Sequence, residues 1–140
     1  MKRLFLIALS LFCLTSYAQT TTTERIVTAK AKSLPFKVIT TDDIANVKVG
    51  DSVLLTSKVY SGKFLDNTGL TLLNLGADYP NQLLTVVIRG NDRKKFASVP
   101  EELFKGKTVS IDGIVSEYKG RKQIVVTNPE QIKFKIIPEK

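Results

Sequence analysis

The amino-acid sequence predicts an all-β domain. Segments rich in Val, Ile, Leu, Thr and Tyr recur from Ser52 onward and are bounded by Gly, Pro, Asn or Asp, which is typical of short strands joined by turns. Among these segments only residues 98–106 have the features of a helix. The last two segments flank a short basic turn at residues 119–122, which predicts a closing hairpin.

Three strands are expected in the first half of the domain, at residues 52–60, 70–75 and 83–89. Their β-branched and aromatic residues favour extended backbone. The segments between them carry Asp66-Asn67-Thr68-Gly69 and Tyr79-Pro80-Asn81, which are turn sequences. The first three strands are therefore expected to be joined by short turns.

The single helix expected is at residues 98–106. Ser98 and Glu101 have the spacing of a capping box, Pro100 is tolerated in a first helical turn, and Gly106 is a suitable stop. These signals predict one short helix directly after the third strand.

Two more strands are expected after the helix, at residues 107–118 and 123–134, with a bulge or bend at Asn128-Pro129. Because side chains alternate between the two faces of a strand, residues two apart share a face. Alternation predicts four inward-facing core residues, namely Val53, Leu55, Val109 and Ile111.

The resulting order of three strands, one helix and a hairpin is the chain order of the OB-fold, a five-stranded Greek-key barrel. In that fold the one short helix lies between strands three and four. An SH3-like barrel would lack this helix, and a β-sandwich would need about seven strands. The fold class expected is therefore an all-β, five-stranded OB-fold barrel.

The amino-terminal end predicts a secretory signal peptide over residues 1–18. Lys2 and Arg3 precede an apolar run, and small residues end at Ala18 before Gln19. A membrane anchor is the alternative, but the apolar run is shorter than the roughly 20 residues a span needs. A lipoprotein is a second alternative, although bulky Phe12 precedes the single cysteine, Cys13. The chain is expected to be periplasmic or extracellular.

Three regions are expected along the chain. Residues 1–18 form the signal, residues 19–49 a flexible arm followed by a capped turn, and residues 50–136 the OB-fold domain. The capped turn is expected at Thr40–Ala45, where a Thr and two Asp residues suit the start of a helical turn.

Residue types exclude several kinds of catalysis. The chain has no His, and Cys13 leaves with the signal, so the mature chain has no thiolate nucleophile, imidazole base or ordinary zinc site. Carboxylates are scattered without the spacing of a nuclease or calcium site, and no Ser–Lys motif is present. The protein is expected not to be an enzyme, and no cofactor or metal is expected.

Residues 73–88 and 104–132 resemble small exported bacterial OB-fold proteins. The second stretch, from Phe104 through Tyr118-Lys119-Gly120-Arg121-Lys122 to Ile132, resembles the closing hairpin of nucleic-acid-binding OB domains of the tRNA-anticodon and helicase type. The resemblance implies the fold and contains no catalytic residue. It does not specify the ligand, because one fold serves many functions.

OB domains bind ligands on strands two and three and at two flanking loops, and single strands are held there by cations and stacking aromatics. Ten residues are expected at this site: Lys58, Tyr60, Lys63, Asn74, Tyr79, Arg89, Tyr118, Lys119, Arg121 and Lys122. Taken singly, each is also typical of an ordinary solvated or packed surface.

Two functions remain open from the sequence. The first is binding of single-stranded nucleic acid or another polyanion. The net charge is compatible with it, since the +8 of the whole chain falls to +6 when Lys2 and Arg3 leave with the signal. The second is a protein–protein or structural role in the cell envelope, through an open strand edge.

Overall fold

The computed structural model describes residues 35–136, and the expected signal peptide and most of the expected arm lie outside them. In chain order the elements are β1 (Lys37–Thr40), the 3-10 helix η1 (Thr41–Asn46), β2 (Ser52–Leu65), β3 (Leu70–Leu75), β4 (Leu84–Ile88), α1 (Gly90–Arg93), α2 (Pro100–Leu103), β5 (Thr108–Tyr118), β6 (Arg121–Val126), the 3-10 helix η2 (Pro129–Gln131) and β7 (Ile132–Phe134). None of the helices in this part of the chain is long and apolar enough to cross a membrane.

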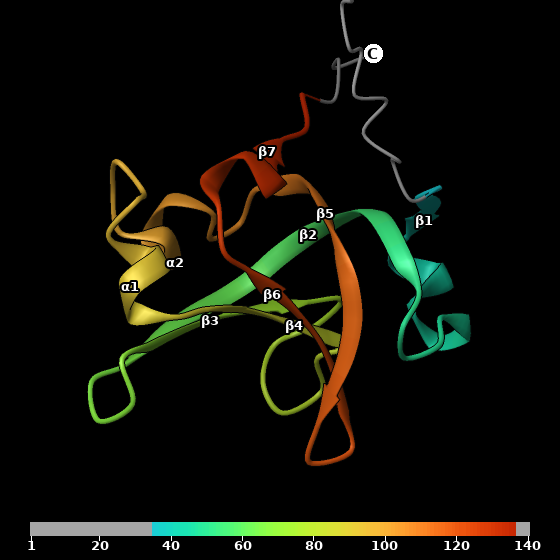
Figure 1. Cartoon of the computed structure of the whole chain (residues 1–140), viewed down its shortest axis with the longest axis horizontal. Coiled ribbons are helices and arrows are strands. Elements are labelled where there is room, and N and C mark those ends of the chain that lie inside the picture. The colour runs from blue at the N-terminus through green and yellow to red at the C-terminus, as the bar shows by residue number, and fades with distance from the viewer. Residues whose placement is uncertain (1–34, 137–140) are drawn as a thin grey trace, which may run out of the picture. The chain divides into compact units, whose positions relative to one another are not determined.

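Five of the strands pair in a closed ring. β2 pairs with β3 and β3 with β4, both antiparallel, and β4 pairs with β6 in parallel. β6 pairs antiparallel with β5, which returns to pair with β2 (Figure 1). The expected all-β class is confirmed, and the order of pairing in this ring is similar to that of an OB-fold barrel.

The core fills the inside of this ring with aliphatic side chains. The four predicted core residues, Val53, Leu55, Val109 and Ile111, are all fully buried. β3 and β4 contribute alternate residues in the same way, so that their intervening side chains face outward. The strand register predicted from the alternation is therefore confirmed.

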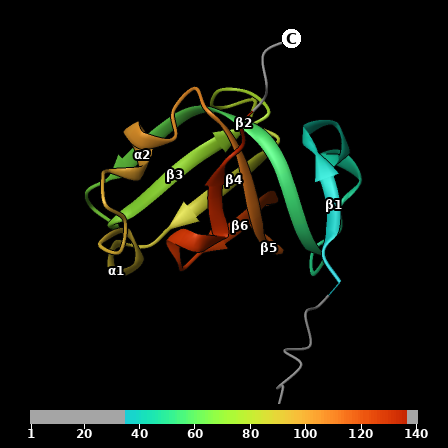
Figure 2. The same ribbon diagram turned by 90° about the horizontal axis from the view of Figure 1, so that it is seen from above.

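Within residues 35–136 the sheet has seven strands, whereas the sequence predicts five. β1 pairs in parallel with the start of β2, beside which it lies in Figure 2, and β7 pairs with β5. β1 is not predicted from the sequence, because a strand of four residues is too short to show a clear alternation. β7 is not predicted as a separate strand. The helix η2, capped by Asn128, interrupts the expected last strand at the predicted bend.

The region between β4 and β5 contains two four-residue helices instead of the single expected one. The expected capping box does not form, since Val99 and not Ser98 occupies the cap of α2. Glu101 instead forms an ion pair with Arg93 of α1. A tertiary contact therefore replaces the local cap that the sequence predicts.

The expected turn at residues 40–45 is the 3-10 helix η1. Thr40 and Asp43 form its capping box, in which the Thr40 backbone amide donates to the Asp43 carboxylate at 2.9 Å. These hydrogen bonds from Thr40, backbone first, hold the pKa of Asp43 below its ordinary value. Ile44 points from η1 into the core, so this turn is packed against the barrel.

Candidate functional site

A groove of about 900 Å³ lies on the outer side of the barrel. Its floor is formed by β2, β3, β4 and β6, and its rim by the β3–β4 loop and the β5–β6 hairpin. This is the face on which OB domains bind their ligands. We call it the groove.

Eight of the ten predicted site residues line the groove. They are Lys63, Asn74, Tyr79, Arg89, Tyr118, Lys119, Arg121 and Lys122. They come from four separate segments of the chain, which the barrel brings to one surface. Tyr79 and Tyr118 are 74% and 61% exposed, so each offers a ring face to a ligand.

Lys58 and Tyr60 do not line the groove. Both lie on β2, where the Lys58 ammonium sits 5.4 Å from the centre of the Tyr60 ring. The sequence places them with Lys63 at a loop, but β2 continues to Leu65 because β3 pairs with it as far as Leu70. A register shift between Val59 and Ser61 changes which residues face the groove.

Two of the predicted cations are held by backbone carbonyls. The Lys122 ammonium donates to the carbonyls of Ile44 at 2.9 Å and Ala45 at 2.8 Å, and thereby ties η1 to the hairpin. Arg121 donates to the carbonyl of Pro80 at 2.9 Å, so the hairpin and the β3–β4 loop lie side by side (Figure 1). These bonds order the rim, and among the described residues that line the groove the other exposed cations are Lys63, Arg89 and Lys119.

The β5–β6 hairpin turns tightly at Lys119 and Gly120. Both have positive φ, 50° and 75°, as the two central residues of a type I′ turn require. The Lys119 ammonium sits 5.3 Å from the centre of the Tyr118 ring. A cation and an aromatic ring are thus presented together at the tip.

The floor of the groove is not among the predicted site residues. Leu70 and Leu72 of β3, Val87 of β4 and Val125 of β6 supply its aliphatic surface. The alternation of side chains along each strand does predict that these residues face outward, because each lies next to inward-facing core residues. The sequence alone does not tell which outward faces of separate strands adjoin.

A second cluster ties the helices α1 and α2 to the barrel, outside the groove. Arg93 bonds Glu101 at 2.6 Å and the Thr71 hydroxyl at 3.1 Å, and its guanidinium lies 4.3 Å from the centre of the Phe64 ring. Burial opposes ionisation of Glu101, but the hydrogen bond and charge of Arg93 outweigh it and hold the pKa of Glu101 below its ordinary value of 4.5. This cluster is a structural ion pair.

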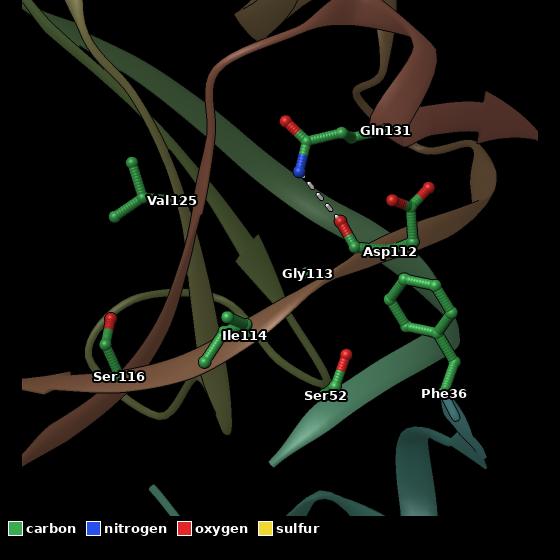
Figure 3. A pocket seen from close by; sticks show the side chains of 8 residues that line it. All are labelled: Phe36, Ser52, Asp112, Gly113, Ile114, Ser116, Val125 and Gln131. Atoms are coloured by element: carbon green, nitrogen blue, oxygen red, sulfur yellow. Dashed lines mark hydrogen bonds between the residues drawn. The ribbon is translucent and has the colours of Figure 1, made fainter. Parts of the chain in front are cut away.

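A smaller hollow of about 440 Å³ lies on the outer side of β5 (Figure 3). The Gln131 side chain donates to the backbone carbonyl of Asp112 at 3.1 Å, and Phe36 lies on the other side of Asp112. None of the ten predicted site residues lines it, and among the described residues that do, Asp112 alone is charged. The groove, which gathers cations and aromatic rings, is the stronger candidate site.

No protein-family model matches the chain, and no curated protein matches its sequence. Among solved structures, an asparaginyl-tRNA synthetase from Pyrococcus horikoshii is similar with TM-score 0.42 and 15% identity, over 61% of this chain and 19% of that chain. Telomere capping protein Ten1 from Saccharomyces pombe is similar with TM-score 0.40 and 17% identity, over 71% and 80%. The hypothetical protein ygiW from E. coli is similar with TM-score 0.39 and 16% identity, over 70% and 89%. The chain spans about a fifth of the synthetase's length.

Proposed function

We propose that this protein is a non-enzymatic binding module that holds single-stranded nucleic acid or another anionic polymer in the groove. The observation that carries the proposal is the convergence of eight predicted residues from separate segments on one groove. Exposed cations attract a polyanion, and exposed aromatic rings add stacking when the polymer carries bases. The proposal requires no metal or cofactor.

The proposal predicts salt-dependent binding of a labelled single-stranded oligonucleotide, measured by fluorescence anisotropy. The logarithm of the binding constant should fall with the logarithm of salt concentration by about 0.7 for each phosphate neutralised. Lys63→Met should lower this slope by about that amount. Tyr118→Ala should weaken binding by about 1–3 kcal/mol through lost stacking.

Tyr60→Ala is the matched control, because Tyr60 is exposed but lies outside the groove. Its affinity should equal that of the wild type. Absence of any binding at low salt would refute the nucleic-acid function. Equal losses from the Tyr60 and Tyr118 substitutions would move the site out of the groove.

Export is part of the proposal and rests on the basic start and apolar run of residues 1–18. We expect mass spectrometry of the protein from its native host to find Gln19 as the first residue. Retention of Met1 in the exported protein, or a lipid on Cys13, would contradict cleavage at that position.

A protein partner in the envelope is the second candidate function. It is favoured by β1 and β7, which form the two outer strands of the sheet order and carry the exposed apolar side chains Val38 and Phe134. An extended segment that adds to such an edge binds through main-chain hydrogen bonds. That binding would tolerate salt, whereas binding in the groove would not.

A further inference from the structure

The floor of the groove carries a row of polar side chains that crosses four strands. Strand register places Ser61 opposite Asn74, Asn74 opposite Thr85 and Thr85 opposite Gln123, and all four line the groove. We call these four residues the polar row. With three interstrand spacings of about 4.8 Å, it is roughly 14 Å long.

An apolar row runs beside the polar row and is offset from it by two residues on each strand. Register places Lys63 opposite Leu72, Leu72 opposite Val87 and Val87 opposite Val125. Three of its four members are aliphatic, and Lys63 lies at its end. The floor therefore offers a hydrogen-bonding line and a parallel apolar line to one ligand.

Some hydrogen-bond donors and acceptors of the polar row are not used within the described part of the protein. Asn74 is only 7% exposed, and its Nδ2 donates to the Ser61 hydroxyl at 3.1 Å, which fixes the amide. Within residues 35–136 the Thr85 hydroxyl and the Gln123 amide form no hydrogen bond of their own. Gln82 also lines the groove, and its enclosed Oε1 has no partner in the same range. A buried polar group without a partner is costly unless a ligand satisfies it.

A polyanion without bases would use the cations but would leave both rows without a matching group. Nucleic-acid bases match both rows, since each base has an apolar face and an edge of hydrogen-bond donors and acceptors. In a single strand these edges are free of pairing and open to side chains. We propose that the polar row reads base edges, so that the ligand is a single-stranded nucleic acid bound with base preference.

This inference rests on the proposed function, and its first test separates the two. Anisotropy titrations at one salt concentration compare labelled oligo(dA), oligo(dC), oligo(dT) and an abasic oligonucleotide of equal length. We expect the abasic chain to bind at least about tenfold more weakly than the best homopolymer. The homopolymers should differ from one another by about fivefold or more, because a good base contact discriminates by about 1–3 kcal/mol.

The second test removes the hydrogen-bonding groups while keeping side-chain size. Thr85→Val combined with Gln123→Met should bring the homopolymers to within about twofold of one another, while the salt slope stays unchanged. Ser116→Ala is the matched control. Ser116 lies opposite Gln123 on β5 but lines the hollow of Figure 3 and not the groove. Its hydroxyl donates to the backbone carbonyl of Gln123 at 3.3 Å and not to the Gln123 side chain, so the wild-type preference should remain.

Three outcomes would contradict base reading by the polar row. Equal binding of all homopolymers and of the abasic chain by the wild type would overturn base reading and leave the polyanion function standing. No binding of any of them would overturn both. The third is a base preference that persists in the double variant when its thermal melt shows that it is folded. In that case the polar row does not determine base preference.

Discussion

Ile111→Ala is expected to lower the free energy of unfolding by about 2–5 kcal/mol. Ile111 is fully buried in the middle of β5, opposite Leu55 of β2 on one side and Ile132 of β7 on the other. The substitution removes apolar contacts at the seam where the ring closes, and the rigid strands around it cannot collapse into the cavity. Urea unfolding followed by circular dichroism measures the loss.

Ile114→Ala is the matched control, on the same strand. Ile114 is 54% exposed on the outer side of β5, so its loss should change stability by about 0.5 kcal/mol or less. A loss below about 1 kcal/mol for Ile111→Ala, or equal losses for both variants, would contradict the inward register of β5.

Arg93→Met is expected to lower the free energy of unfolding by about 2–3 kcal/mol. This is somewhat less than the loss of one partner costs in a fully buried ion pair. Its guanidinium bonds Glu101 and Thr71 and covers the Phe64 ring. Methionine keeps much of the apolar contact but leaves the Glu101 carboxylate without a cation. One oxygen of that carboxylate is already enclosed and has no hydrogen-bond partner within residues 35–136. Chemical unfolding at neutral pH measures this loss.

The same pair makes stability depend on pH. Because the folded-state pKa of Glu101 lies below its ordinary value of 4.5, the contribution of the pair is fully present above that value. It is lost as the pH falls through the folded-state pKa. Unfolding measured from about pH 7 to about pH 3 should show a steeper loss in the wild type than in Arg93→Met.

Lys95→Met is the control for the ion pair. Lys95 pairs with Asp92 at 2.7 Å, but its side chain is 53% exposed, so the change should cost at most about 1 kcal/mol. Arg93→Met and Lys95→Met variants of equal stability would contradict a special role for the Arg93–Glu101 pair.

The barrel is largely predictable from sequence because its strands obey local rules. Alternation in β2 and β5 identifies the inward residues, and Gly and Asn at the turns separate the strands. β1 is too short to show a pattern, and its place depends on pairing with a strand further along the chain. The capping signal at Ser98 is misleading, since Glu101 meets Arg93 only in the folded chain.

The candidate site is predictable in its residues but not in their roles. Tyr118 and Lys119 follow from the position of the hairpin. From the sequence, Lys122 is indistinguishable from any other surface cation. In the structure its ammonium donates to the carbonyl of Ile44, 78 positions away. The polar row is also hidden, because it depends on the register between β4 and β6, which are not consecutive.

The closure of the ring through β2 and β5 has a consequence for how the chain folds. The hairpins β2–β3, β3–β4 and β5–β6 join neighbouring segments, whereas the β2–β5 and β4–β6 pairs join segments separated by other elements. Distant pairing costs loop entropy before its contacts form, which slows folding. We expect the hairpins to form early and the seam to form last, so that the facing edges of β2 and β5 stay open to pairing with other chains until the barrel shuts.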